Sequence, residues 1–495
     1  MQLHAHRYCA AAGPLGAVNR KASKQAMKID IKVKNFGKIK DADLRIRPFT
    51  VIAGKNSSGK SFITKALYSF FSTINKDFAA AEALKNIDHI IAFSTAVFSS
   101  IRLSKFEKEI SDRIIFMEKE LLRLIHQVYA EQTFSLQLEN SSYFSSITNN
   151  IREAIEDFAK TIAEKKKFEK VEHDIDQIRI SLRNLQSLFE KPTSHIVSQI
   201  RDEFKESLKE NFQVGQLPDL KNFSSSPEEN PIFDFGEIGT IEIPGDSVIF
   251  SLRHNGIDLL QEFSNIVYLD SPTYWRLKQP LERVKEASKF NFFLHFKRQD
   301  RLSGVPKYFY DLMDLLSDRI KSNTTSSDFD EIKKIINNNI EGEMTISPSN
   351  AIVFKDRNSG KEINLHSTAA GITNLGVIGL LIERNIISRG SYIFIDEPEV
   401  NLHPAWQKIM IDSLYALSEK GINIVIATHS IDMLKCIEGI VEKMDPENAA
   451  DHFGINQLSC EGTSIDGGKY PARQIASIKA DLGQSFINMQ NSSGW

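Results

Sequence analysis

Cysteine is scarce in this sequence of 495 residues, which contains only Cys9, Cys436 and Cys460. The three lie far apart and form no Cys-x-x-Cys pair, so the sequence offers neither a zinc-binding motif nor a disulfide framework. A reducing cytoplasm is the simplest context for such a chain, and we expect a cytoplasmic protein. Long apolar stretches are also absent: no run of 18 or more apolar residues occurs, so we expect no membrane span and no membrane partner.

A surplus of either charge is missing as well. Lys and Arg total 61 and Asp and Glu total 64, which gives a net charge of −3. This balance gives no argument for nucleic acid as a partner, although it does not exclude a local basic face. One stretch rich in basic and aromatic residues fits such a face, which would contact phosphates and stack on bases. It equally fits a solvated helix face over a core, which we favour. Its residues are Tyr274, Trp275, Arg276, Lys278, Arg283, Lys285, Lys289, Phe290, Phe292, Phe293, Lys297, Arg298, Arg301 and Lys307.

Acidic residues are absent from residues 1–26. Gly13, Pro14 and Gly16 interrupt the apolar part of this segment, which therefore lacks the continuous apolar core of a signal peptide. We expect a disordered extension ahead of Met27, which is a candidate for the natural start.

The sequence from Met27 onward has the pattern of an α/β protein. Residues 28–34 alternate, with Ile29, Ile31 and Val33 on one face, which predicts a strand. Two more strands are predicted at 42–46 and 49–53; a glycine-containing loop and a buried helix at 62–71 follow. We therefore assign residues 27–76 to the first part of a phosphate-binding domain.

Residues 77–213 are predicted to be a helical insertion. Apolar residues recur with a spacing of three and four in residues 103–128 and again in 171–189. This spacing predicts a coiled-coil-like hairpin or an ordinary helical bundle within one domain. The Pro-, Ser- and Asn-rich residues 214–240 are predicted to be a linker.

The second part of the domain is expected at residues 241–440. Its clearest segment alternates helices and short buried strands: a helix at 374–384, a strand at 392–395, a helix at 405–417 and a strand at 423–427. This alternation is typical of parallel α/β topology. Residues 441–495 form a tail with a predicted helix at 474–489. The expected fold class is α/β, with a mixed or parallel sheet, flanking helices and the helical insertion.

One motif predicts a phosphate-binding loop. Its residues are Gly54, Lys55, Asn56, Ser57, Ser58, Gly59, Lys60 and Ser61, which match G-x-x-x-x-G-K-[ST] at every fixed position. Glycines at its two ends let consecutive backbone N–H groups point into one concavity, and the following helix adds the positive end of its dipole. Lys60 then reaches the β- and γ-phosphates, and Ser61 offers a hydroxyl to Mg²⁺. ATP and Mg²⁺ are the expected cofactors.

Two later strands end in polar residues that complete this chemistry. Asp396 and Glu397 follow the apolar strand at 392–395. Asp396 is placed to hold Mg²⁺ through water, and Glu397 to orient or deprotonate the attacking water. His429 follows the strand at 423–427, where an imidazole is placed to contact the γ-phosphate.

The order of these motifs, with Leu402-His403-Pro404 after Asp396-Glu397-Pro398-Glu399, resembles ABC-type ATPases of the overcoming-lysogenisation (OLD) and SMC-like group. Within that group the sequence is similar to ATPase subunits of anti-phage systems such as Septu, PARIS and certain retrons. The resemblance implies two heads that sandwich two ATP molecules. It makes Asp396 the Walker B residue, Glu397 the catalytic carboxylate and His429 the switch histidine, and it places residues 399–403 on the D-loop.

The resemblance also implies a signature loop, with which each head completes the ATP site of the other head. In this loop the sequence departs from the family. The matching residues are Ser367, Thr368, Ala369, Ala370 and Gly371. Gly371 fits, whereas Ala369 replaces the usual serine. Ser367 or Thr368 must then donate to the nucleotide, or the contact is weaker and hydrolysis slow. No clear Gln-loop is found, and Asp270 is a weak candidate for that position.

The expected function is a slow ATPase whose nucleotide-dependent head dimer acts as a sensor or scaffold in anti-phage defence. Only 66 residues follow His429, too few for the nuclease domain of an OLD-type protein, so a separate nuclease or toxin effector and a phage-encoded trigger are the expected partners. The alternative is an SMC-like clamp that holds DNA in repair or recombination. A transporter ATPase fits poorly because of the large insertion.

Overall fold

The computed structural model describes residues 28–131, 133–163, 168–253, 263–270, 304–317 and 329–492, six single positions between 256 and 281, and no side chain after Gln484. The extension expected at residues 1–26 lies outside the described residues. The chain divides into two compact units. One holds residues 74–201 and a short piece near residue 258, and the other holds the remainder of the described chain.

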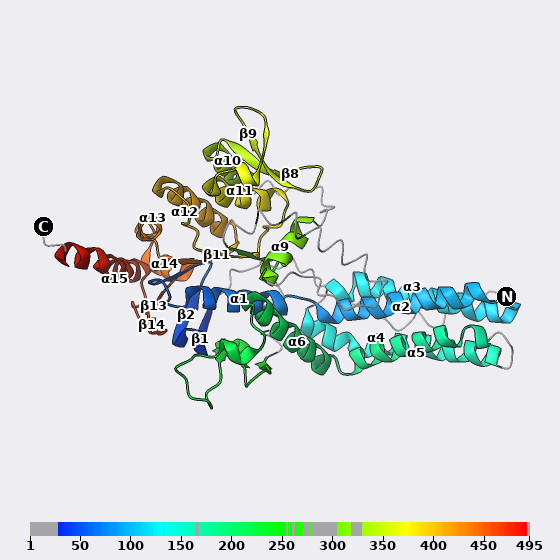
Figure 1. Ribbon diagram of the computed structural model, residues 1–495. Coiled ribbons are helices and arrows are strands. Elements are labelled where there is room, and N and C mark those ends of the chain that lie inside the picture. Colours follow the sequence, from blue (N-terminus) through cyan, green and yellow to red (C-terminus); the bar gives the residue numbers. More distant parts are fainter. Residues whose placement is uncertain are drawn as a thin grey trace. The chain divides into compact units, whose positions relative to one another are not determined.

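The first unit is a bundle of four helices: α2 (Phe78–Ser100), α3 (Lys105–Gln127), α4 (Phe134–Ala163) and α5 (Glu172–Glu190). Each packs on the next in sequence, and α5 closes the ring on α2 (Figure 1). The predicted helical insertion is thus confirmed as a helical region, and its form is the bundle rather than a single hairpin.

The start of α3 shows how the sequence sets a helix boundary in this unit. The hydroxyl of Ser104 accepts from the backbone N–H of Glu107, and the carboxylate of Glu107 accepts from the backbone N–H of Ser104 at 2.6 Å. This reciprocal pair satisfies two N–H groups that the helix leaves without an internal acceptor. Ile114, Leu121 and Ile125 then point inward and are fully buried.

The second unit contains a six-stranded sheet of order β14-β13-β3-β12-β11-β7. Its strands are β3 (Phe49–Ala53), β7 (Ile266–Leu269), β11 (Tyr392–Asp396), β12 (Asn423–Thr428), β13 (Phe453–Leu458) and β14 (Ser464–Ile465). All neighbours are parallel except β14, which runs antiparallel to β13. The predicted parallel α/β core is therefore confirmed.

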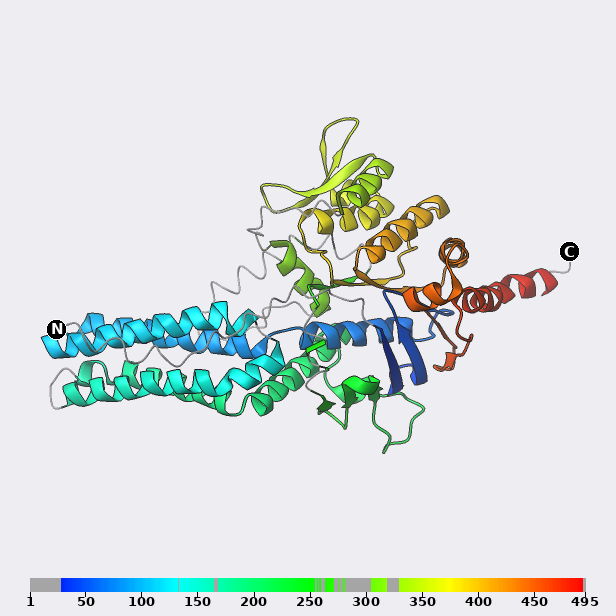
Figure 2. The same cartoon turned by 180° about the vertical axis from the view of Figure 1, so that it is seen from behind.

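Along the chain, helices lie between and after the strands of this sheet (Figure 2). They are α1 (Lys60–Ile74), α9 (Lys307–Ser317), α11 (Ala370–Glu383), α12 (Pro404–Glu419), α13 (Ile431–Val441), α14 (Pro446–His452) and α15 (Pro471–Ser492). A further helix, α6 (Pro192–Phe212), belongs to the first unit up to residue 201 and to the second unit from residue 202. Among them α11 has the most continuous buried surface, with ten of its residues buried from Gly371 to Ile382. No helix in the described part of the chain is both long and apolar enough to span a membrane.

Two antiparallel sheets complete this unit. One has the order β2-β1-β4-β5-β6, and its strands are β1 (Ile29–Phe36), β2 (Ile39–Ile46), β4 (Ile232–Asp234), β5 (Gly239–Glu242) and β6 (Ile249–Leu252). The other consists of β8 (Gly342–Ile346), β9 (Ile352–Asp356) and β10 (Glu362–Asn364), and α10 (Asp330–Asn339) contacts β8.

Residues 214–240 differ from the predicted linker. They include β4, which pairs with β1, and the buried side chains of Leu217, Leu220, Phe233 and Phe235. The ring of Phe233 lies 5.0 Å from that of Phe36 on β1. The segment is therefore part of the fold, and its Pro- and Ser-rich composition reflects the turns between these buried positions.

Candidate nucleotide site

The predicted phosphate-binding loop lies between β3 and α1. Gly59 has a φ of +97°, a backbone conformation that L side chains rarely adopt. A Cβ atom there would lie 2.6 Å from Ile39 at the start of β2. The turn therefore favours glycine at this position, and a larger residue would also have to displace the end of the Ile39 side chain.

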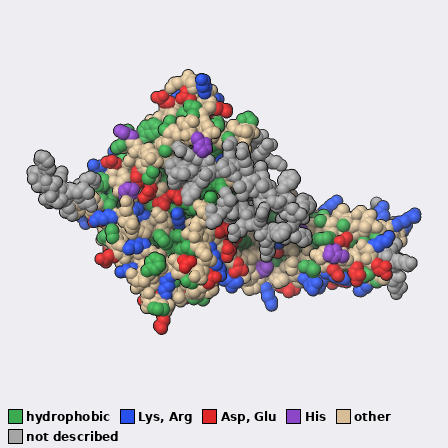
Figure 3. All heavy atoms as spheres, in the orientation of Figure 1, with side chains coloured by type: hydrophobic (Ala, Val, Ile, Leu, Met, Phe, Trp, Pro, Cys, Tyr) green, Lys and Arg blue, Asp and Glu red, His purple; other side chains and the backbone are tan. Residues whose placement is uncertain are grey.

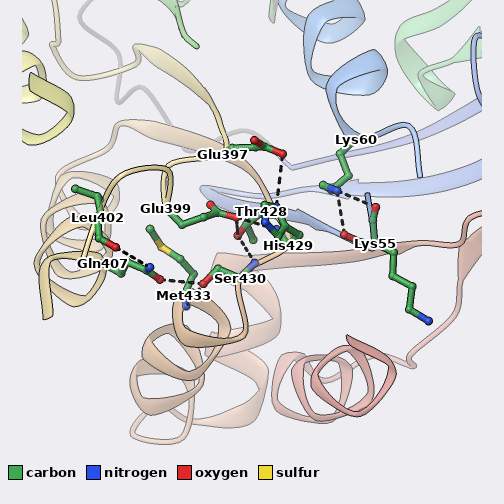
Figure 4. Close-up of polar contacts among 11 residues, drawn as sticks. Lys55, Lys60, Glu397, Glu399, Leu402, Gln407, Thr428, His429, Ser430 and Met433 are labelled. Atoms are coloured by element: carbon green, nitrogen blue, oxygen red, sulfur yellow. Dashed lines mark hydrogen bonds and ion pairs between the residues drawn. The ribbon is translucent and has the colours of Figure 1, made fainter. Parts of the chain in front are cut away.

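Lys60 is held inside the loop that precedes it. Its Nζ donates to the carbonyl oxygens of Gly54 at 2.9 Å and Lys55 at 3.0 Å, and the residue is 5% exposed (Figure 4). Burial lowers the pKa of Lys60, while nearby carboxylates, Glu397 foremost, act in the opposite direction. The ammonium group is thus directed into the concavity of the loop.

The residues between Gly54 and Gly59 lie in three different environments. Lys55 points away from the loop, and its Nζ lies 2.8 Å from Oδ1 of Asp481 on α15, a contact that the sequence analysis did not predict. Asn56 and Ser57 are exposed. Ser58 is fully buried, and its hydroxyl has no hydrogen-bond partner in the structure.

Asp396 ends β11 close to Ser61 at the start of α1. The hydroxyl of Ser61 hydrogen-bonds to its carboxylate, and the hydroxyl of Tyr268 donates to Oδ2 at 3.4 Å. Oδ1 is buried without a partner. Burial, reinforced by the nearby charges of Asp270 and Glu397, raises the pKa of Asp396 to about 6.

These oxygens fit the requirements of Mg²⁺, which binds one or two protein oxygen ligands and keeps waters or substrate phosphates for its other positions. The unpartnered Oδ1 of Asp396 and the hydroxyl of Ser61 are the atoms that would face such an ion. No group of three or more His, Cys, Asp or Glu side chains suited to a metal occurs among the described residues, and Mg²⁺ at a triphosphate does not need one.

Glu397 and His429 lie together at the ends of β11 and β12. Glu397 has a φ of +51°, and its backbone N–H donates to the carbonyl of Ala427 at 2.9 Å. Its Oε1 lies 3.5 Å from Nδ1 of His429, and the two side chains are about 40% exposed. A non-glycine residue with this φ is uncommon and marks a backbone held by its surroundings.

Glu399 has a part in this site that its sequence pattern does not reveal, because the resemblance places it only on the D-loop. Its side chain is 7% exposed. Oε1 accepts from the hydroxyl of Thr428 at 2.7 Å and from the backbone N–H of His429 at 2.9 Å, and it lies 3.3 Å from Nδ1 of His429 (Figure 4). Its spacing of two from Glu397 was the available signal, because both carboxylates follow one buried strand.

Further hydrogen bonds join the D-loop to its neighbours. Gln407 on α12 donates to the carbonyl of Leu402 at 3.1 Å and accepts from the hydroxyl of Ser430 at 2.9 Å. Asn374 on α11 donates to the carbonyl of Val400 at 2.9 Å. Residues 399–403, the predicted D-loop, are therefore tied both to the loop that carries His429 and to α11, which follows the predicted signature segment.

The signature segment lies at the start of α11. Thr368 is buried, and its hydroxyl donates to the carbonyl of Asn364 at 3.0 Å, whereas Ser367 is exposed. A Cβ at Gly371 would lie 2.9 Å from the carbonyl oxygen of Asn401, so this glycine permits close packing on the D-loop. Of the two hydroxyls that the sequence leaves as donors, only that of Ser367 lies on an exposed residue.

A cavity of about 570 Å³ opens beside the phosphate-binding loop. It is lined by residues that include Lys38, Lys40, Lys60, Ser61, Phe223 and Glu397. Ser367, Thr368 and Gly371 are not among its lining residues. Of the predicted site residues, those that line this cavity are Asn56, Ser57, Gly59, Lys60, Ser61 and Glu397. Its lining does not include Gly54, Lys55, Ser58, Asp396, His429 or the signature residues.

Asp270, the weak candidate for the Gln-loop position, follows β7 beside Asp396. Its Oδ2 lies 3.9 Å from Nζ of Lys65, and the hydroxyl of Tyr308 donates to it. The neighbourhood fits that position, and the role remains a prediction.

Only part of the basic stretch predicted at residues 274–307 is described. Lys278 and Lys307 are buried, and their ammonium groups bind the carbonyl of Asn350 and the carboxylates of Asp311 and Glu203. Trp275 is also buried, against Phe309. Its remaining residues, Tyr274, Arg276, Arg283, Lys285, Lys289, Phe290, Phe292, Phe293, Lys297, Arg298 and Arg301, lie outside the described residues.

The sequence model of the AAA ATPase domain matches residues 27–434, so the chain belongs to this family. The Old nuclease of Escherichia phage P2 is 52% identical over 42 residues, which are 8% of this chain and only 7% of that protein. The predicted ATPase class and the resemblance to the OLD-like group are thereby confirmed.

Solved SMC head domains are similar at low identity. That of Pyrococcus furiosus, with an extended coiled coil and bound to the C-terminal domain of ScpA, is 12% identical with a TM-score of 0.37, over 89% of this chain and 95% of that one. That of Thermotoga maritima is 10% identical with a TM-score of 0.30, over 87% and 94%. At such scores these similarities add nothing to what the strand order and loops show.

Asp396→Asn is expected to stabilise the nucleotide-free chain in a pH-dependent way. The pKa of this carboxyl rises from 3.8 to about 6 on folding, so its ionised form opposes folding. This penalty is absent below pH 4, grows as the pH rises, and is complete above about pH 6. The variant should gain up to about 3 kcal/mol of unfolding free energy at pH 8 relative to its gain at pH 4. Urea unfolding across this range measures the difference, with the exposed Asp88→Asn as control.

Glu399→Ala is expected to lower the free energy of unfolding by about 1–3 kcal/mol, because the hydroxyl of Thr428 and the N–H of His429 lose their buried acceptor. Glu399→Gln keeps an acceptor oxygen and should cost less. Denaturant unfolding compares both with Glu109→Ala, an exposed glutamate on α3. Equal stability of Glu399→Ala and Glu109→Ala would show that this contact does not hold the loop.

Proposed function

We propose that the chain binds ATP with Mg²⁺ in the cavity beside the phosphate-binding loop and hydrolyses it there. The observation that carries this proposal is the meeting of Lys60, Asp396, Glu397 and His429, which come from three segments far apart in sequence. Lys60 binds the β- and γ-phosphates, and Ser61 and Asp396 hold Mg²⁺, which neutralises charge on the phosphates. The backbone N–H groups of Gly54, Lys55, Asn56, Ser57, Ser58 and Gly59 form the surrounding anion nest.

Glu397 is the residue that acts on water in this proposal. Its carboxylate lines the cavity beside Lys60 and Ser61 and is partly exposed, so water reaches it. A carboxylate in this place orients a water molecule for in-line attack and accepts its proton. His429, whose Nδ1 faces Glu397 and Glu399, is left with Nε2 to contact the γ-phosphate.

The cavity is completed by a second head in our proposal. Ser367, Thr368 and Gly371 do not line the cavity of their own chain, and Ser367 is exposed at the end of the short 3₁₀ helix Leu365–Ser367, which precedes α11. A second copy that brings this helix start to the γ-phosphate would add an N-terminal dipole and a hydroxyl, with Ser367 as the donor. Hydrolysis would then require a head-to-head dimer, and the missing serine at Ala369 would make it slow.

Lys60→Ala is expected to abolish ATP binding, since the ammonium group inside the loop is lost. Glu397→Gln should bind ATP normally and turn it over at least about 100-fold more slowly, because the general base is removed. Equilibrium binding and phosphate release measure the two effects, with the exposed Lys334→Ala and Glu362→Gln as controls. Wild-type turnover in Glu397→Gln would remove this residue from catalysis.

ATP is expected to convert the Glu397→Gln variant from the mass of one chain to that of two, because the nucleotide is trapped between heads. Ser367→Ala in the same background should weaken this shift. Native mass spectrometry with and without ATP measures it. A dimer that forms equally without ATP would contradict nucleotide-dependent pairing of the heads.

We further propose that this pairing serves anti-phage defence by holding and releasing a separate effector, a nuclease or a toxin, in response to a phage-encoded trigger. The support is the motif order and the segment similar to the Old nuclease, a phage protein that is itself named a nuclease. For the alternative, an ATP-dependent DNA clamp, the described residues provide no favouring observation, and of the basic stretch they include only Trp275, Lys278 and Lys307. Lys278 and Lys307 are buried, and on the face drawn in Figure 3 basic and acidic side chains are interspersed outside the grey atoms.

Co-expression of the chain with its neighbouring genes, followed by purification with and without ATP, tests the role in defence. A stoichiometric nuclease or toxin in the complex would support the effector proposal. A bare dimer that retains DNA in a nucleotide-dependent and salt-sensitive way would support the clamp instead.

A further inference from the structure

Phe223 is the most exposed large hydrophobic side chain that the structure describes, with 96% of its surface accessible. It lies in the turn after the short 3₁₀ helix Leu217–Leu220, within the segment expected to be a linker. An aromatic ring so fully exposed makes little apolar contact with the protein. Its apolar surface is removed from water only when a ligand or partner covers it. The residues around Phe223 therefore indicate which kind of ligand would cover the ring.

The backbone around Phe223 is fixed to the turn between β1 and β2. Asn222 is buried, and its side chain donates to the carbonyl of Gly37 at 2.9 Å while its backbone N–H donates to that of Asn35 at 3.0 Å. Its carbonyl oxygen Oδ1 accepts from the N–H of Ser224 at 2.8 Å. Both neighbours of Phe223 are thus held by hydrogen bonds, so the ring is presented from a defined position.

The turn between β1 and β2 is in contact with the phosphate-binding loop. Phe36, at the end of β1, packs edge-on against Phe62 in the first turn of α1, with ring centroids 6.1 Å apart. The side chain of Ile39, at the start of β2, packs against Gly59, where a Cβ would lie 2.6 Å from its Cδ1. Phe223 is consequently carried on the same rigid frame as Lys60 and Ser61, and it lines the same cavity.

We propose that Phe223 is the platform on which the base of the bound nucleotide stacks. This inference rests on the proposed ATP site and adds to it the place of the base. The cavity of about 570 Å³ falls within the range of small-molecule sites, roughly 300–1,000 Å³. Its phosphate end is marked by Lys60 and Ser61, and an aromatic ring on its wall offers a π-face to the base, a contact that tolerates every base.

Phe223→Ala is expected to weaken ATP binding by about 5- to 150-fold, the range that loss of one aromatic–base stack gives. Inorganic tripolyphosphate with Mg²⁺ has no base, so its affinity should be unchanged in the same variant. Phe223→Trp should keep ATP affinity, and its indole fluorescence should change with ATP and not with tripolyphosphate. Phe116→Ala, which removes a ring that is 71% exposed on α3, is the matched control and should bind both ligands as the wild type does.

Equal loss of ATP and tripolyphosphate affinity in Phe223→Ala would overturn the inference, because the ring would then support the loop rather than the base. Unchanged affinity for both would overturn it as well. If unchanged affinity were accompanied by a weaker dimer in native mass spectrometry, the ring would instead be covered by a second copy. A wild-type chain that binds neither ligand would refute the proposed nucleotide site itself, and that result differs from all the others.

Discussion

The parallel register of β3, β12 and β11 is the constraint on which the rest of the site depends. Thr428 pairs with Ala53, and Asp396 pairs with Ala427, so the three strands end in one row. Lys60, Ser61, Asp396, Glu397 and His429 all lie within a few residues of that row, in or just after the loops that follow these strands. Because side chains in a parallel sheet follow the backbone register, a shift of one residue in either pairing would separate the acidic residues from the loop that binds phosphate.

A single buried carboxylate, that of Glu399, holds a second part of the site in place. Glu399 accepts two hydrogen bonds from the β12 end and thereby fixes the loop that carries His429. The same D-loop is bound by Asn374 of the helix behind the signature segment. In a dimer of heads this segment and the D-loop would both face the second copy. In the proposed dimer, these hydrogen bonds would link the segment near the partner's nucleotide to the loop that carries His429.

The sequence predicts most of what is encoded locally. The loop from Gly54 to Ser61 has a fixed spacing, and short β-branched strands followed by acidic residues mark the sheet core, so the fold class and the main site residues could be read directly. What failed depends on pairing over long distances. The three residues of β4 are hidden among prolines and serines. The spacing of Glu399 from Glu397 points to a carboxylate at this site but not to its contacts, because Thr428 and His429 lie 29 and 30 positions away. Asn222, beside Phe223, likewise bonds to Gly37, 185 positions away. The tail strand β13 gave no recognisable pattern.

The sheet order has a consequence for the synthesis of the chain. β3 carries the phosphate-binding loop, yet its two neighbours are β12 and β13, which begin at Asn423 and Phe453. During translation the loop leaves the ribosome long before either strand exists, and β3 then presents five apolar or β-branched residues with unpaired edges on both sides. At about 5–20 residues per second this interval lasts roughly 20–80 seconds. Until β12 and β13 are made, this strand therefore has two open edges that could pair with another chain.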